Sequence, residues 1–442
     1  MNRGRARAGV AEIELRPALG LATEDGAPRA TGYLTPLYAK ALVLANGDAE
    51  VAIVTLDLMG IDRQDALRAA VLASERTGIP AQHIVMICSH THVAPSMLPT
   101  LHTYRAAFNP GWDDAAKARE RAWVDVVVAT IADAVAAAKV QLQEVSIGAV
   151  ATELPWLVFN RRRHTRDYGV WTHWMGIPPN EAYRAEGPID SQFQVFVVRD
   201  AQYRPFCLLW NFTGHNSFNF ADKYAGDLAY TVQQAIDDGI GRHVPCLYAP
   251  GCSGDTNYFD YQGQGIQDHK GLQKATEGVA SAIVAIYRDV CTLPEVQLGS
   301  RKAELFLAQR DISRYWWEHD IETKMPGWMD YGRAEVERFQ AEAAEAATYQ
   351  TDVMAMRLGE TALVALPGEL FAEFGLLIKE RSPFPHTLVA SYANDYAGYV
   401  ATRAAYGGGS YEVWPVLNAR IGREGGYLMV DKAIELLEDL YD

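Results

Sequence analysis

The fold class is clearest in residues 50–90, which read EVAIVTLDLMGIDRQDALRAAVLASERTGIPAQHIVMICSH. Residues 50–58 form a continuous apolar run, as expected for a strand that is covered on both faces. A helix is predicted from Asp62, a good N-cap residue, to Gly78. Residues 83–90 form a second buried strand. This strand–helix–strand order predicts an α/β fold in which ligands gather at the carboxyl ends of the strands.

The same alternation continues along the chain. Further strands are predicted at 144–152, 192–200, 205–215, 244–250, 351–368 and 386–394, and helices at 114–139, 227–239, 269–289, 369–381 and 429–440. No segment has the composition of a linker. We therefore expect one domain over residues 1–442 with a mixed β-sheet core and flanking helices. We also expect a long loop insert at about 153–190 and a helical insert at about 310–350.

The composition is that of a soluble globular protein. The 442 residues are 49% hydrophobic and 21% charged, and the net charge of −15 argues against nucleic acid or an anionic membrane as partner. A signal peptide and a membrane-spanning segment are not recognisable. The five cysteines lack metal-binding spacing and indicate buried thiols. We expect a cytoplasmic protein that acts on a small molecule, and the sequence is compatible with a homo-oligomer.

Histidines follow two of the predicted strands. His90 and His92 share a face if the strand continues through them, which suits a zinc ion. The alternative is that they are polar residues at a strand end. His215 closes another apolar strand, where a structural histidine is the alternative. Two such strand ends in one sheet can meet at one site.

Two further segments carry residues suited to a catalytic site. The stretch GCSGDTN, residues 251–257, contains Asp255, which can bind a metal or orient a histidine, and Asn257. An ordinary tight turn is the alternative. Glu369 follows a Pro-Gly pair at a predicted helix start, where a carboxylate either caps the helix or acts as a third zinc ligand.

Together these motifs resemble the neutral ceramidase family of zinc amidases. SHTH at 89–92, FTGH at 212–215, GCSGDTN and PGE at 367–369 occur in the order found in that family. The N-terminal GVAEIELRPALG and LTPLYAKALVLANGDAEVAIVTLDLMGI are similar to its opening segment. The resemblance extends from about Gly9 to Glu412. It implies the fold of the ceramidase N-terminal catalytic domain and one zinc ion per chain.

The resemblance also implies roles for individual residues. His90, His215 and Glu369 match zinc ligands, and Tyr399, within ANDYAGYVATRAAYGGGSYE at 393–412, matches a fourth ligand. Tyr411 matches a residue that stabilises the transition state. His92 matches a histidine that contacts the reacting group, and Arg161 of FNRRRH matches an active-site arginine.

The chain departs from the family in two places. Asn257 stands where ceramidases have a serine, so a serine nucleophile is not available there. The chain ends soon after Tyr411, and we expect it to lack the C-terminal sandwich domain of true ceramidases. Without that domain and without a signal peptide, we expect a soluble substrate in place of membrane ceramide.

These residues predict a zinc-dependent hydrolase that cleaves an amide, ester or lactone. Zinc lowers the pKa of bound water to about 7, which supplies a nucleophile without serine. Tyr411, His92 and Arg161 are candidate donors to the oxyanion. His92 or Asp255 is the candidate proton shuttle. Asp57, at the end of a strand, is expected to hold a metal-binding histidine, and a second metal there is the less favoured alternative.

Other interpretations of these residues stay open. The run RRRHTR at 161–166 is either a solvated charge cluster or a clamp for an anionic group. Aromatic residues of 168–183 and 315–331 either line a pocket or pack in the core. A metal-dependent lyase or isomerase acting on a sugar-like substrate is the alternative function, and a non-catalytic binding protein is a further one.

Overall fold

The structure is a computed structural model that describes most of the chain. The described residues are 2–23, 30–99, 106–108, 112–166, 169–177, 182–218, 222–258, 269–312, 316–417 and 419–442.

The larger of two β-sheets contains eight strands in the order β15–β13–β12–β7–β2–β4–β5–β6. Its strands are β2 (Arg7–Leu15), β4 (Leu37–Ala45), β5 (Glu50–Leu56), β6 (Ile84–Cys88), β7 (Gln143–Glu153), β12 (Gln192–Asp200), β13 (Pro205–Phe212) and β15 (Cys246–Pro250). β5 pairs with β6 in parallel, and so does β13 with β15. The segments that leave the carboxyl ends of β6 and β13 carry His90 and His215.

The large sheet consists of two four-stranded halves that are joined at one end. β2 and β7 pair at two positions only, where Arg7 lies opposite Glu144 and Ala8 opposite Gln143. By contrast, β2 pairs with β4 over nine positions. The strands β2, β4, β5 and β6 therefore form one half, and β7, β12, β13 and β15 form the other.

A second, four-stranded sheet packs against the large one. Its strands, in spatial order, are β18 (Leu298–Ala308), β19 (Thr348–Leu358), β20 (Thr361–Ala365) and β22 (His386–Ala390). Ile53 and Leu209, from the two halves of the large sheet, share one buried core with Met354 and Leu363 of the small sheet. The large sheet is thus buried on this face by the small sheet and on the other face by helices, which explains its continuous apolar runs.

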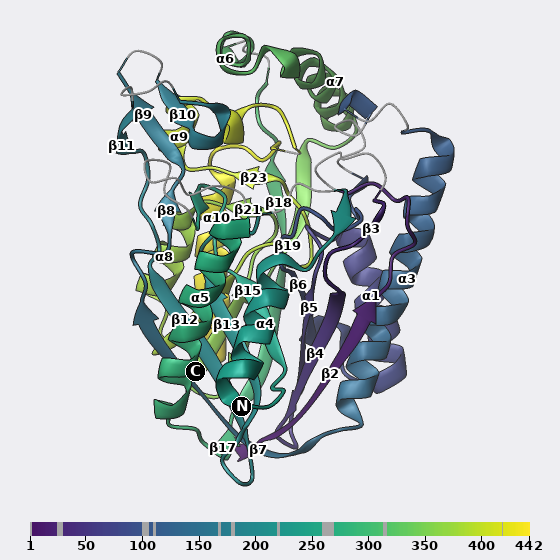
Figure 1. The fold of residues 1–442 in the computed structure, drawn as a ribbon, viewed down its shortest axis with the longest axis vertical. Helices are drawn as coiled ribbons and strands as arrows, with labels where there is room; N and C mark the ends of the chain where they lie inside the picture. The colour runs from purple at the N-terminus through teal and green to yellow at the C-terminus, as the bar shows by residue number, and fades with distance from the viewer. Residues whose placement is uncertain are drawn as a thin grey trace.

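Helices cover the outer faces of both sheets (Figure 1). The helices described are α1 (Arg63–Thr77), α3 (Asp114–Lys139), α4 (Asp227–Ile240), α5 (His269–Ile286), α6 (Trp316–Lys324), α7 (Met329–Glu345), α8 (Ala372–Arg381), α9 (Arg403–Gly408) and α10 (Gly425–Tyr441), of which α6 and α7 lie at one end of the molecule. α1 and α3 pack on one half of the large sheet, α4 and α5 on the other, and α8 and α10 on the small sheet. α1 begins at Asp62, whose side chain accepts a bond from the Gln64 amide, and ends at Gly78, as predicted.

Short elements complete the fold. They are β1 (Gly4–Arg5), β3 (Gly32–Tyr33), β8 (Phe159–Asn160), β9 (Arg162–Thr165), β10 (Val170–Thr172), β11 (Ala182–Ala185), β14 (Lys223–Tyr224), β16 (Thr256–Asn257), β17 (Glu295–Val296), β21 (Glu369–Leu370), β23 (Tyr399–Val400) and the 3₁₀ helices Ala81–His83, His173–Met175, Tyr287–Asp289, Pro326–Trp328 and Tyr411–Val413. In Figure 1, β21 and β23 lie toward the end that carries α6 and α7, and both chain termini lie toward the other end.

The structure differs from the sequence-based expectation at 153–190. This segment, expected to be a loop, contains β8 to β11, and β9 pairs with β10 and β11 in a small antiparallel sheet. Apolar periodicity does not predict these strands, because β9 consists of the polar residues Arg162, Arg163, His164 and Thr165. The helical segment expected at 310–350 contains α6 and α7. Among the described residues, every helix is too short or too polar to span a membrane.

Candidate metal centre

His90 is placed by a constrained turn directly after β6. Its φ is +61°, a left-handed value that is unusual for a residue other than glycine and is common at functional sites. Its ring is fully buried and stacks on Tyr392 with 3.9 Å between centroids. The His90 Nδ1 lies 2.9 Å from the Met59 carbonyl oxygen. Because a carbonyl can only accept, Nδ1 carries the proton and Nε2 keeps a lone pair.

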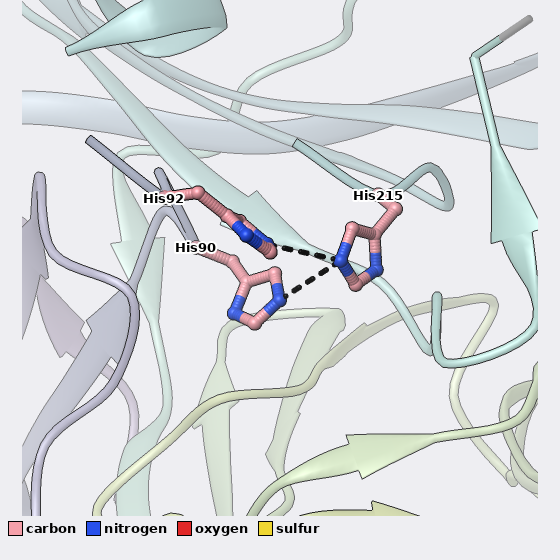
Figure 2. A group of neighbouring side chains, drawn as sticks. All are labelled: His90, His92 and His215. Carbon is pink, nitrogen blue, oxygen red and sulfur yellow. Dashed lines mark hydrogen bonds between the residues drawn. The ribbon is translucent and has the colours of Figure 1, made fainter. Parts of the chain in front are cut away.

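The other two histidines turn toward the same point (Figure 2). The His215 Nε2 lies 3.2 Å from the His90 Nε2 and 3.1 Å from the His92 Nε2. One potential ligand atom from each of the three rings lies within 4.8 Å of the others. The His215 Nδ1 faces the Ser253 carbonyl oxygen at 3.4 Å, which again directs the Nε2 lone pair inward.

Burial keeps two of these rings neutral. It lowers the pKa of His90, and burial together with the positive charge of Arg161 lowers the pKa of His215 well below the usual range. A neutral imidazole is the form that binds a metal ion. Burial thus favours the metal-binding form of His90 and His215.

Glu369 completes the cluster from the segment that follows β20 of the small sheet. The structure places it in β21, ahead of α8, and not at the start of that helix as expected. Its Oε1 accepts a bond from the Tyr396 hydroxyl at 2.5 Å, and its Oε2 lies 3.5 Å from the His90 Nε2. Burial opposes ionisation, but His90, Tyr396 and Arg161 outweigh it and lower the pKa of Glu369.

The donor set fits a zinc ion. Glu369 is fully buried, and its Oε2 has no hydrogen-bond partner among the described residues. An ionised buried oxygen without a partner is costly unless a cation binds it. Two or three imidazole nitrogens with one carboxylate oxygen are the ligands of many catalytic zinc sites. His90, His215 and Glu369 can hold the ion. The His92 Nε2 is as close to the His215 Nε2 as the His90 Nε2 is.

Tyr399 lies beside Glu369 because β21 and β23 run in parallel with these two residues paired. The Arg161 Nη2 donates to the Tyr399 hydroxyl at 3.0 Å, and the guanidinium is almost fully buried. The sequence-predicted residues Arg161 and Tyr399 therefore meet at the edge of the histidine cluster. Their contact positions a positive charge next to the candidate metal ligands.

Glu412 holds Arg161 in place. Its Oε1 accepts from the Arg161 Nε at 2.8 Å, and its Oε2 accepts from Arg162 at 2.6 Å and from the Thr172 hydroxyl at 2.8 Å. Burial opposes ionisation of this carboxyl, but the two arginines outweigh burial and lower its pKa. Glu412 thus fixes the guanidinium that faces Tyr399.

Arg162 does not have the role of a clamp that we considered for the run at 161–166. Its guanidinium is fully buried and forms ion pairs with Glu412 and Glu186, and it donates to the Gly409 carbonyl oxygen. Through these contacts, Arg162 stabilises the loop around Tyr411. Of the two neighbouring arginines, Arg161 is the one that faces the candidate site.

Tyr411 stands at the junction between the site and a group of aromatic rings. Its ring lies 5.4 Å from Tyr399, 4.7 Å from Trp174 and 5.6 Å from Trp328. Trp174 and Trp328 come from the two aromatic segments noted in the sequence, and both are partly exposed. The structure therefore brings these segments together next to the predicted catalytic tyrosine.

Comparisons with known proteins now bear on this geometry. No protein-family model matches the chain, and the curated proteins contain no match. A solved structure of a ceramidase complexed with C2 superposes with a TM-score of 0.71 over 99% of this chain and 75% of that chain, at 16% identity. The neutral ceramidase from Pseudomonas aeruginosa superposes with a TM-score of 0.70 over the same shares, at 17% identity. The chain has the fold of neutral ceramidase. The fold predicted from the sequence motifs is thereby confirmed.

The contacts of Asp57 differ from those expected from the sequence. Its carboxylate accepts from the Tyr38 amide at 2.8 Å and interacts with Ser89, and the Met59 carbonyl, not Asp57, holds His90. Asp57 lines a separate cavity of about 250 Å³ together with Lys40 and others. The expectation that it orients a metal-binding histidine is therefore wrong.

Asp255 is also turned away from the histidines. Its Oδ1 accepts from the amide of Ala372, the first residue of α8, and its Oδ2 accepts from the Asn160 side chain, both at 2.8 Å. The carboxylate therefore caps a helix and is not placed as a proton shuttle. Burial raises its pKa to about 7.

The substitution Asp255→Asn distinguishes these roles. A helix cap predicts a loss of about 1–2 kcal/mol of unfolding free energy at pH 5, with the hydrolytic rate largely unchanged. The loss should be smaller at pH 8. Because the folded pKa is raised, the wild-type carboxyl loses stabilising free energy as the pH rises from its ordinary pKa of 3.8 to about 7. Urea unfolding at both pH values measures this, and a large loss of rate at full zinc content would restore the shuttle role.

Asn257 and His173 lie on the Arg161 side of the candidate site. Asn257 forms a backbone bridge to His215, and its Nδ2 donates to the His173 Nδ1 at 3.3 Å. The His173 amide donates to the Arg161 carbonyl oxygen at 2.9 Å. Burial and the nearby Arg161 lower the pKa of His173 to about 3, so its ring is neutral.

Sequence reasoning missed several residues of this site. His173 lies in the segment expected to be a loop, and no spacing to the other histidines marks it. Glu412 follows Tyr411 directly, so the pair Tyr-Glu was the available signal. Tyr396, the donor to Glu369, and Tyr392, which stacks on His90, lie just ahead of Tyr399.

Proposed function

We propose that this chain is a zinc-dependent hydrolase that cleaves an amide bond in a small, polar, soluble substrate. The proposal depends above all on the convergence of the His90, His92 and His215 Nε2 atoms beside the unpartnered, buried oxygen of Glu369. His90, His215 and Glu369 would hold the ion, with Tyr399 as fourth ligand. The fold shared with two solved ceramidase structures supports an amide as the bond that is cleaved.

A bound zinc ion supplies Lewis-acid polarisation and a nucleophilic water near neutral pH. The residues of the chain then have separate tasks. Arg161 donates through Nε and Nη2 to Glu412 and Tyr399, and among the described residues its Nη1 has no partner. Those remaining donors can bind a substrate oxygen on which negative charge develops.

His92 and Tyr411 are the other groups proposed to act on the substrate. His92 is partly buried and touches the cluster through its Nε2, so it can take a proton from water and deliver it to the leaving nitrogen. Hydrolysis adds the oxygen of water to the acyl carbon, breaks the C–N bond and leaves the proton on the amine. Tyr411 is proposed as a second donor to the oxygen of the acyl group.

The preference for a polar substrate rests on the polar side chains around the cluster, which include His92, Arg161, His173 and Asn257. A cytoplasmic location, a single catalytic domain and the absence of nucleic-acid or membrane partners remain predictions from the sequence. A homo-oligomer is compatible with them.

Metal analysis and product analysis test the proposal. Protein purified without chelator is expected to contain about one zinc per chain, and removal of the metal should abolish amide hydrolysis until zinc is restored. Reaction of a panel of N-acyl amines, esters and lactones in ¹⁸O-labelled water should place the label in the carboxylate product. Turnover without incorporation of the label would instead indicate a lyase, and protein without bound metal would contradict the proposal.

A further inference from the structure

The side-chain oxygen of Asn257, Oδ1, is a buried hydrogen-bond acceptor without a partner among the described residues. The residue is 1% exposed. Most buried polar atoms in proteins are paired, so an unpaired one at a candidate site calls for an explanation. Asn257 adjoins a candidate metal ligand, because its backbone is bridged to that of His215.

The nitrogen of the Asn257 amide faces His173. The Nδ2 donates to the His173 Nδ1 at 3.3 Å, so the oxygen is the end of the amide that remains for another molecule. His173 is itself anchored by its backbone bond to Arg161. Asn257 therefore lies between a metal-binding histidine and the segment that carries Arg161.

An amide oxygen only accepts hydrogen bonds, so its partner must be a donor. The other groups proposed to bind the acyl part of the substrate are donors, in particular the Arg161 guanidinium. A secondary amide offers both kinds of group, a carbonyl oxygen for the donors and an N–H for an acceptor. An ester or a lactone offers the oxygen but has no N–H.

We propose that the Asn257 Oδ1 accepts a hydrogen bond from the N–H of the scissile amide, and that this bond selects secondary amides over esters. The inference rests on the proposed function and adds to it the class of bond that is cleaved. A substrate without the N–H leaves the buried acceptor unpaired, and a site built for such a bond discriminates strongly against the analogue that lacks it.

A matched pair of inhibitors measures this bond without turnover. A phosphonamidate and the phosphonate of the same structure mimic tetrahedral species from an amide and an ester, and they differ by one N–H. In the zinc-loaded wild type, calorimetry is expected to show that the phosphonamidate binds about 10- to 100-fold more tightly, the effect of one unpaired buried acceptor. In Asn257→Leu, which has the same shape without an acceptor, the two affinities should become similar.

Asn257→Asp is the matched control because it keeps an acceptor oxygen, and it should retain the preference for the phosphonamidate. Zinc content and circular dichroism show whether each variant is folded and loaded, and Asn257→Ala serves if the leucine variant is not. Equal affinities in the wild type, or an unchanged preference in the leucine and alanine variants, would overturn the inference and show that Oδ1 binds water only. Failure of the proposed function is a separate result, in which the wild type has no zinc and cleaves neither amides nor esters.

Discussion

Zinc binding is expected to be abolished in the His215→Ala variant while the fold is retained. His215 lies at the centre of the cluster, since its Nε2 is within 3.2 Å of both other histidine nitrogens. Loss of residues that merely orient metal ligands already costs about 10- to 100-fold in affinity, so loss of the ligand should cost more than about 100-fold. Amide hydrolysis should disappear with the metal.

Two measurements check this result. Elemental analysis should fall from about one zinc per chain to a trace. In the wild type, zinc at 100 times its Kd should add about 2.7 kcal/mol to the unfolding free energy, and in the variant it should add nothing. His319→Ala, which removes an exposed histidine outside the cluster, is the matched control and should bind zinc normally. Full zinc content in His215→Ala would show that the ligands are placed wrongly.

The second large effect is expected for Glu412→Gln, which removes the charge from a fully buried carboxylate. Arg161 and Arg162 both form ion pairs with it, and Arg161 has no other carboxylate partner among the described residues. Removal of one partner from a buried ion pair typically costs about 3–5 kcal/mol, because the remaining charge stays buried. The unfolding free energy should fall by that amount, and Arg161 should lose its orientation.

The pH dependence of stability provides an independent check. The pKa of Glu412 is lowered from its ordinary value of 4.5, so its contribution is fully present above that value and is lost as the pH falls through the folded pKa. Urea unfolding should therefore show that the difference between wild type and Glu412→Gln shrinks at acidic pH.

Glu424→Gln is the matched control, since Glu424 pairs with Arg403 on the surface. Exposed ion pairs contribute about 0–1 kcal/mol. A similarly small loss in Glu412→Gln would contradict a supporting role for the buried network.

Much of the site follows from the sequence because strand ends can be recognised locally. The apolar runs before His90 and His215 predict buried strands, and in α/β folds ligand-binding residues gather at the carboxyl ends of such strands. Glu369 and Tyr399 are identified mainly through the resemblance to a known family, and the short strands β21 and β23, which bring them together, are not predicted from the sequence. The positions of these four residues required only the pattern of the chain and the resemblance to a known family.

The supporting contacts could not be predicted because they depend on residues far apart in the sequence. Asp57 and Met59 are equally close to the strand end, and only the turn geometry shows that the Met59 carbonyl holds His90. The burial of Arg162 depends on Glu412, 250 positions later. A run of three arginines looks like a solvated surface until its counter-charges are located.

The origins of the metal ligands have a consequence for how the protein holds together. His90 follows one half of the large sheet, His215 follows the other half, and Glu369 follows the small sheet. The two halves of the large sheet share only two paired positions between β2 and β7, far along the strands from the histidines. A metal ion at this point would link three parts of the chain that few backbone hydrogen bonds join at this end of the strands. Metal binding would then add to the stability of the contacts among these three parts.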